Sequence, residues 1–198
     1  MNTRTRPHFS ARDGGARMVT LRVAVLTTLV AAACAPVVPL RSKPGGAAHW
    51  AHTRALPEAA RWAPAALLCR IFGLGVGHEG WLPDRGGIWK LTYWAPEKTG
   101  VLEVSVDSDG NVSASEAADS PARGRTLPPD WQDSPKVWHA TTRHLRGDPI
   151  STFEAEFAHD AEPERYPGQA VWRIRFYLQE GGFETHVVSS SAEWLASY

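Results

Sequence analysis

Charged side chains at alternating positions form the most distinctive chemical pattern in the sequence. Two glutamates lie two residues apart in one candidate strand, and two arginines have the same spacing in another. Because successive strand residues point to opposite faces of a sheet, residues two apart share a face. We therefore expect a polar open face on which cross-strand ion pairs contribute about 0.2–1 kcal/mol each. Its members are Glu154, Glu156, Arg173, Arg175 and His186.

This face has two possible uses beyond that of a solvated surface. As a flat platform it would receive another protein or a peptide. As a pocket that gathers Glu154, Glu156 and His186, it would offer acid–base groups to a hydrolase with a nonstandard site. A flat open sheet would favour the first use, and a concave pocket with the three side chains within hydrogen-bond reach would favour the second. The register of residues 183–188 stays open, because either Phe183 or Glu184 begins the inward-facing set.

Other catalytic chemistries lack the residues that they need. The sequence has no Gly-x-Ser-x-Gly motif, and Ser189–Ser191 fall in an expected hairpin turn. His49 and His52 lie three residues apart, without the further ligands of a zinc site. The glycine-rich segment 73–77 follows no expected strand, so it does not predict a phosphate loop. We expect no catalytic residues, no metal and no cofactor.

The first 34 residues have the composition of an export signal. They hold five arginines and one aspartate, followed by an apolar run from Val23 to Ala33. This order is typical of a secretory leader, with Met1 or Met18 as its start. Eleven residues are too short to span a hydrocarbon core of roughly 30 Å. Without the leader, the chain has a net charge of about −4, which disfavours nucleic acid as a partner.

Small residues before a cysteine suggest how the leader ends. The segment Ala31 to Cys34 resembles the lipobox of bacterial lipoproteins, although Ala31 stands where that family prefers leucine. The resemblance implies cleavage before Cys34, lipid attachment to it and, with Ala35 following, an outer-membrane location. Ordinary signal cleavage is the alternative, giving a soluble periplasmic or secreted protein. Cys69 would then be able to pair with a retained Cys34.

The remaining chain divides into four segments. Residues 35–48 are rich in proline, glycine and alanine and predict a flexible tether. A helix-and-sheet unit is expected over 49–115, a linker over 116–129 and a second unit over 130–198. Asp133 and a following proline predict a helix start in the second unit. In the first unit, the apolar stretch from Ala55 to Phe72 predicts a helix that Pro64 kinks or splits.

The two expected units share a pattern. The segment Trp89–Trp94 matches Trp172–Tyr177 in character at each position, 83 residues further along the chain. Each is followed by a glycine-containing turn and a second strand, which indicates tandem copies of one unit. Alternation in the later segment places Trp172, Ile174 and Phe176 on one apolar face. An antiparallel sheet with one solvent-exposed face needs a helix to cover its apolar face, so we expect the α+β fold class.

A helix followed by such strands is similar to the PepSY-like repeat of secreted bacterial proteins. The segment Val101–Val112, with its aspartate-containing turn and Gly110, carries the resemblance. The second copy is more divergent, with Ala192 in place of that glycine, and the unit also looks like the cystatin type of fold. The resemblance implies two similar units, which would be able to form one continuous sheet, and a binding or inhibitory module without catalytic residues.

Together these patterns predict a non-catalytic lipoprotein of the cell envelope. We expect it to bind a protein or peptide there. Two alternatives remain, a secreted hydrolase that uses the polar face and a carrier of a small apolar ligand held between helix and sheet.

Overall fold

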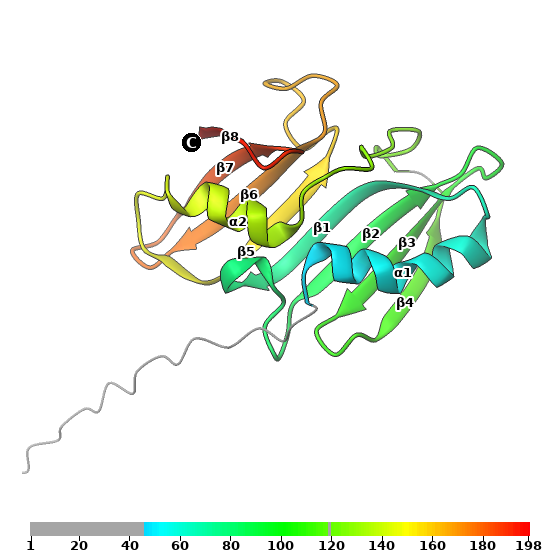
Figure 1. The fold of residues 1–198 in the computed structure, drawn as a ribbon, viewed down its shortest axis with the longest axis horizontal. Helices are drawn as coiled ribbons and strands as arrows, with labels where there is room; N and C mark the ends of the chain where they lie inside the picture. Colours follow the sequence, from blue (N-terminus) through cyan, green and yellow to red (C-terminus); the bar gives the residue numbers. More distant parts are fainter. Residues whose placement is uncertain (1–45, 119) are drawn as a thin grey trace, which may run out of the picture. The chain divides into compact units, whose positions relative to one another are not determined.

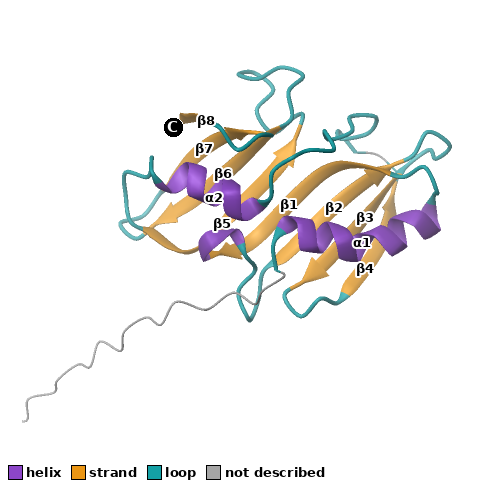
Figure 2. Cartoon of the chain, viewed as in Figure 1, coloured by secondary structure: helices purple, strands orange, loops and turns teal. Residues whose placement is uncertain are grey.

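Residues 46–118 and 120–198 are described by the computed structural model. The expected leader, Cys34 and residues 35–45 of the tether lie outside the described residues. The described chain forms one antiparallel sheet of eight strands with two helices, which confirms the α+β class. The sheet is continuous and open, and Figures 1 and 2 show both helices on one of its faces.

The element order is a helix and four strands, followed by a second helix and four more strands. The elements are α1 (Ala48–Trp62), β1 (Leu67–Gly77), the 3-10 turn η1 (His78–Gly80), β2 (Ile88–Trp94), β3 (Val101–Asp107), β4 (Val112–Ala117), α2 (Ser134–Thr142), β5 (Pro149–Ala158), β6 (Val171–Leu178), β7 (Phe183–Ser189) and β8 (Trp194–Ser197).

The pairing of β1 with β5 joins the two halves of the sheet. The strand order is β4-β3-β2-β1-β5-β6-β7-β8. All the remaining neighbouring strands are consecutive in the chain. Ile71 faces Phe157 and Gly73 faces Ala155 across this junction. Within residues 46–118 and 120–198, the sheet therefore runs outward from β1 and β5 to two outermost strands, β4 and β8.

The helix-covered face is lined with large apolar side chains. Trp172, Ile174 and Phe176 are buried there, as the alternation in β6 predicts. In the other half of this face, α1 covers β2, β3 and β4 with a stripe of alanines at helical spacing, and these small side chains let the helix lie close to the sheet. The stripe consists of Ala48, Ala51, Ala55 and Ala59.

The first half departs from the predicted helix between residues 55 and 72. Helix α1 ends at Trp62, because the residue before Pro64 is driven into an extended conformation. The apolar stretch that follows is strand β1. This strand lies between β2 and β5, and apart from Arg70 the residues on both of its faces are apolar, although Leu67 and Leu74 remain 46% exposed. Its sequence therefore shows little alternation to distinguish it from a buried helix.

The expected tether also ends earlier than residue 48. Ala47 and Ala48 are buried, and α1 begins at Ala48. The indole Nε1–H of Trp89 donates a hydrogen bond of 2.9 Å to the carbonyl oxygen of Gly46. This buried bond holds the chain on the core before the helix begins.

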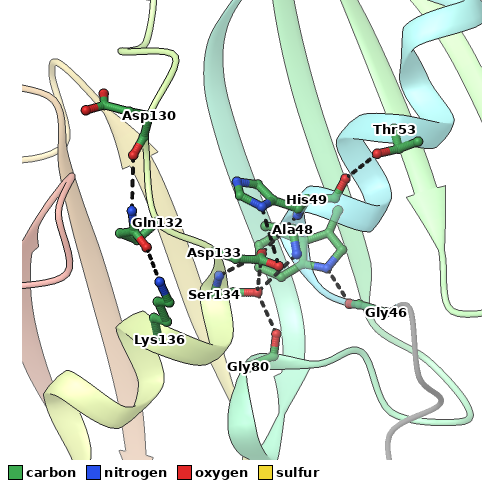
Figure 3. Close-up of polar contacts among 11 residues, drawn as sticks. Gly46, Ala48, His49, Thr53, Gly80, Asp130, Gln132, Asp133, Ser134 and Lys136 are labelled. Atoms are coloured by element: carbon green, nitrogen blue, oxygen red, sulfur yellow. Dashed lines mark hydrogen bonds and ion pairs between the residues drawn. The ribbon is translucent and has the colours of Figure 1, made fainter.

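The N-termini of α1 and α2 meet at two adjacent side chains (Figure 3). Asp133 Oδ1 accepts hydrogen bonds from the backbone N–H of His49 and of Ser134, at 2.9 and 2.8 Å. Ser134 Oγ accepts from the N–H of Ala48 at 3.0 Å and donates to the carbonyl of Gly80 at 2.7 Å. One carboxylate and one hydroxyl thus satisfy N–H groups at the starts of both helices.

Gly80 allows this meeting point to form. Its φ of 78° is unfavourable for other residues, and an added Cβ would lie 2.5 Å from the carbonyl carbon of Ser134. Turn η1 is thereby pressed directly against the start of α2.

We predict that Ser134→Ala lowers the free energy of unfolding by about 1–2 kcal/mol, because it removes a buried cap shared by two segments. Urea denaturation measures the change. Thr53→Ala is the control, since the Thr53 hydroxyl is exposed and bonds only within α1. Equal losses in the two variants would contradict the role given to Ser134.

Candidate functional site

Glu156 is the centre of the predicted polar face. This carboxylate is 3% exposed, yet it forms ion pairs with Arg70 of β1 and Arg173 of β6. Arg173 also donates from Nη1 to the carbonyl of Ala161 at 3.1 Å. The pair between Arg70 and Glu156 crosses the β1–β5 junction, so the network links both halves of the sheet.

Glu154 forms a second, more exposed group on the same face. It lies opposite Arg175, whose Nη1 is 3.4 Å from Glu154 Oε2. The hydroxyl of Tyr177 donates to Glu154 Oε1 at 2.7 Å, and this bond to the carboxylate raises the pKa of Tyr177. Both predicted glutamates and both predicted arginines therefore share a face, and their charges are largely neutralised within it.

His186 lies on the other face of the sheet, so its assignment to the polar face is wrong. It pairs with Ile174 in the β6–β7 ladder and is completely buried on the helix-covered side. The register places Glu184 on that side as well. The sheet thus separates His186 from Glu154 and Glu156, and the three acid–base groups of the hydrolase alternative are not brought together.

The buried imidazole of His186 sits among polar neighbours. Trp194 donates from Nε1 to His186 Nδ1 at 3.3 Å, which leaves the ring proton on Nε2. Nε2 is 3.0 Å from Glu184 Oε1, although neither atom is aligned for a hydrogen bond. Burial lowers the pKa of His186, and the Glu184 charge opposes this shift without cancelling it.

The loop between β5 and β6, residues 159–170, covers part of the polar face. Ala158, Ala161, Val171 and Val187 form a second small apolar cluster on this side of the sheet, with Tyr166 of the loop packed against it. This covering accounts for the burial of Val187 beside a charged network. The open face is therefore narrower than the alternation of side chains predicts.

A groove of about 690 Å³ lies between α1, the start of β1 and the segment that leads to α2. Leu127 bonds to β1 through its N–H, which is 2.8 Å from the carbonyl oxygen of Leu68. Trp131 packs against Phe157 and Trp172 at ring separations of 5.9 and 6.0 Å. The segment 126–131 thus forms a fixed wall of the groove.

Sequence reasoning missed this groove because it assigned residues 116–129 to a linker. Strand β4 continues to Ala117, and Leu127 is buried in the main core. The available signal was a leucine, two prolines and a tryptophan at positions 127–131, since prolines stiffen a segment and large apolar residues hold it on a core.

Cys69 is buried, and it lies in strand β1 within the stretch for which a helix was expected. Burial raises the pKa of its thiol to about 11, which leaves little reactive thiolate. Within the described ranges, no group of three or more histidine, cysteine or carboxylate side chains is placed to hold a metal. Among the described residues no helix is long and apolar enough to cross a membrane.

No protein-family model, curated protein or solved structure matches this chain.

We predict that Glu156→Gln lowers the free energy of unfolding by about 1.5–3 kcal/mol, because two arginines lose their shared buried anion. Chemical denaturation of Glu154→Gln serves as the comparison. Glu154 is 24% exposed by side chain, so its loss should cost less than about 1 kcal/mol. A smaller effect at Glu156 than at Glu154 would contradict the structure.

We predict that the folded protein loses stability as the pH falls below about 6.5, the ordinary pKa of histidine. The pKa of His186 and that of His52 are both lowered in the fold. Below that pH these two histidines bind more protons in the unfolded chain than in the folded chain, so a falling pH favours unfolding.

Denaturation of His186→Gln between pH 5 and 8 tests the contribution of His186. The variant should show a shallower pH dependence than the unmodified chain. His139→Gln, at an exposed position on α2, should keep the original dependence. Indistinguishable slopes for the two variants would show that His186 does not resist protonation.

Proposed function

We propose that this chain is a non-catalytic binding protein of the cell envelope. It holds an extended segment of a partner protein by adding that segment as a strand beside β4. Main-chain hydrogen bonds supply the affinity in this mode of recognition, and side chains beside the edge supply the selectivity. The observation that carries the proposal is that no strand of the described residues pairs with the outer edge of β4.

The ladder between β3 and β4 leaves alternate backbone groups of β4 without a strand partner. Asp107 donates its N–H to the carbonyl of Asn111 at 3.1 Å, and the register continues without a shift to Ala117. In an antiparallel ladder every second pair carries the bonds. The N–H and C=O groups of Val112, Ala114 and Glu116 therefore face outward, away from β3.

Features that protect sheet edges are largely missing from β4. Its six residues contain no proline, lysine or bulge, and its side chains are mostly small and exposed. Natural edge strands usually carry such protection because a regular free edge pairs with other strands. The opposite edge, β8, has four residues and a register shift against β7, so it offers a shorter and less regular template.

Two sequence features support the cellular setting and the class of protein. The basic and apolar composition of residues 1–34 favours export, and the lipobox-like end favours attachment through Cys34. One helix followed by four strands occurs twice along the chain, and this order supports two units of the PepSY-like or cystatin type. The separation of Glu154 and Glu156 from His186 leaves the hydrolase alternative without its assembled site.

We predict that Ala114→Pro abolishes partner binding without unfolding the protein. Proline removes an outward N–H, and its ring obstructs an incoming strand, while the β3–β4 bonds are kept. Envelope extract supplies the partner for affinity capture, and the captured partner should fall at least tenfold in this variant. Ala114→Thr is the matched control, because it keeps the N–H and suits a strand.

Amide hydrogen exchange of the captured complex provides the decisive measurement. The amides of Val112, Ala114 and Glu116 should exchange more slowly in the complex than in the free protein. Unchanged exchange at these amides, or equal capture by the proline variant, would reject the proposal. A dimer of this chain that Ala114→Pro dissociates would also reject it, since the edge would then serve a second copy.

A further inference from the structure

We propose that the groove beside α1 is a binding site for an uncharged, largely apolar small molecule that carries a hydrogen-bond acceptor. This site is separate from the β4 edge and does not rest on the function proposed there. Its volume of about 690 Å³ falls within the range of small-molecule sites, which is roughly 300–1,000 Å³.

The lining explains why the ligand is apolar. Leu56, Leu68, Leu127 and Trp131 contribute aliphatic and aromatic surface, and Leu56 remains 46% exposed. An apolar group placed against these side chains removes their surface, and its own, from water. The two prolines that follow Leu127 add rigid apolar surface, so little side-chain freedom is lost when the groove is filled.

The charges explain why the ligand is uncharged. No aspartate, glutamate, lysine or arginine belongs to the described residues that line the groove. Asp133 contacts the lining residue His49 at 3.8 Å, but its carboxylate already receives N–H groups from both helices. A charged ligand would lose hydration in this groove without gaining an opposite charge.

His52 supplies the polar contact. Its Nδ1 is 2.9 Å from the hydroxyl of Tyr93, which is 1% exposed and has no other acceptor among the described residues. The hydroxyl therefore donates to Nδ1, and the neutral ring carries its proton on Nε2. Burial and the neighbouring His49 lower the pKa of His52, which keeps this donor neutral. A carbonyl or ether oxygen of the ligand would accept from Nε2–H.

The test uses para-methylacetophenone, an uncharged aromatic ketone, as the probe. Para-toluate has a similar shape with a negative charge, and para-xylene lacks the acceptor. Titration of the full chain is followed by the NMR signal of the Trp131 indole N–H and by the backbone amides of Thr53 and Leu127. The ketone should bind at least tenfold more tightly than the carboxylate and measurably more tightly than the hydrocarbon.

Two leucines give a matched pair of variants. Leu56 lines the groove and Leu74 lies on β1 away from it, and each is 46% exposed. Leu56→Glu should weaken ketone binding at least tenfold, whereas Leu74→Glu should leave it within twofold. His52→Phe should remove the preference for the ketone over the hydrocarbon. Absence of shifts at millimolar ketone, tighter binding of the carboxylate, or equal loss in both leucine variants would overturn the proposal.

Discussion

The shared cap at Asp133 and Ser134 is the interaction on which the arrangement of the helices depends. Each helix begins with N–H groups that lack partners inside the helix, and a buried start without partners is costly. Here one carboxylate and one hydroxyl receive such groups from α1 and α2, across 84 to 86 residues of sequence. The cap works only because Gly80 approaches Ser134 closely. The starting points of both helices on the sheet are therefore set together.

With both helices on one face, the two faces of the sheet acquire different chemistry. The covered face holds the aromatic core and the groove beside α1, whereas the other holds the ion pairs around Glu156. These ion pairs neutralise one another locally, and the carboxylate at their centre is buried. The pair between Arg70 and Glu156 therefore links the two strands of the β1–β5 junction, and the use of this face as a platform for a protein or peptide stays a prediction.

Short-range patterns were predictable from the sequence, and long-range pairings were not. The alternation of Trp172, Ile174 and Phe176 reports directly which face of β6 is buried, and Asp133 with its following proline marks the start of α2. In contrast, β1 is apolar on both faces apart from Arg70, so its sequence shows little alternation. The inward position of His186 depends on a register that one residue of slippage would reverse. The groove arises where Leu127 meets Leu68, a contact that no local pattern in either segment encodes.

The buried polar groups are compatible with the binding role proposed above. A catalytic acid or base needs access to substrate and a pKa near the working pH. His186 is enclosed by Trp194 and Glu184, the pKa of Cys69 is raised, and His52 is kept neutral as a partner of Tyr93. The two surfaces proposed for binding are of a different kind, a row of backbone N–H and C=O groups along β4 and a groove whose lining holds no acidic side chain, lysine or arginine. In both proposals the selectivity comes from shape and hydrogen-bonding capacity.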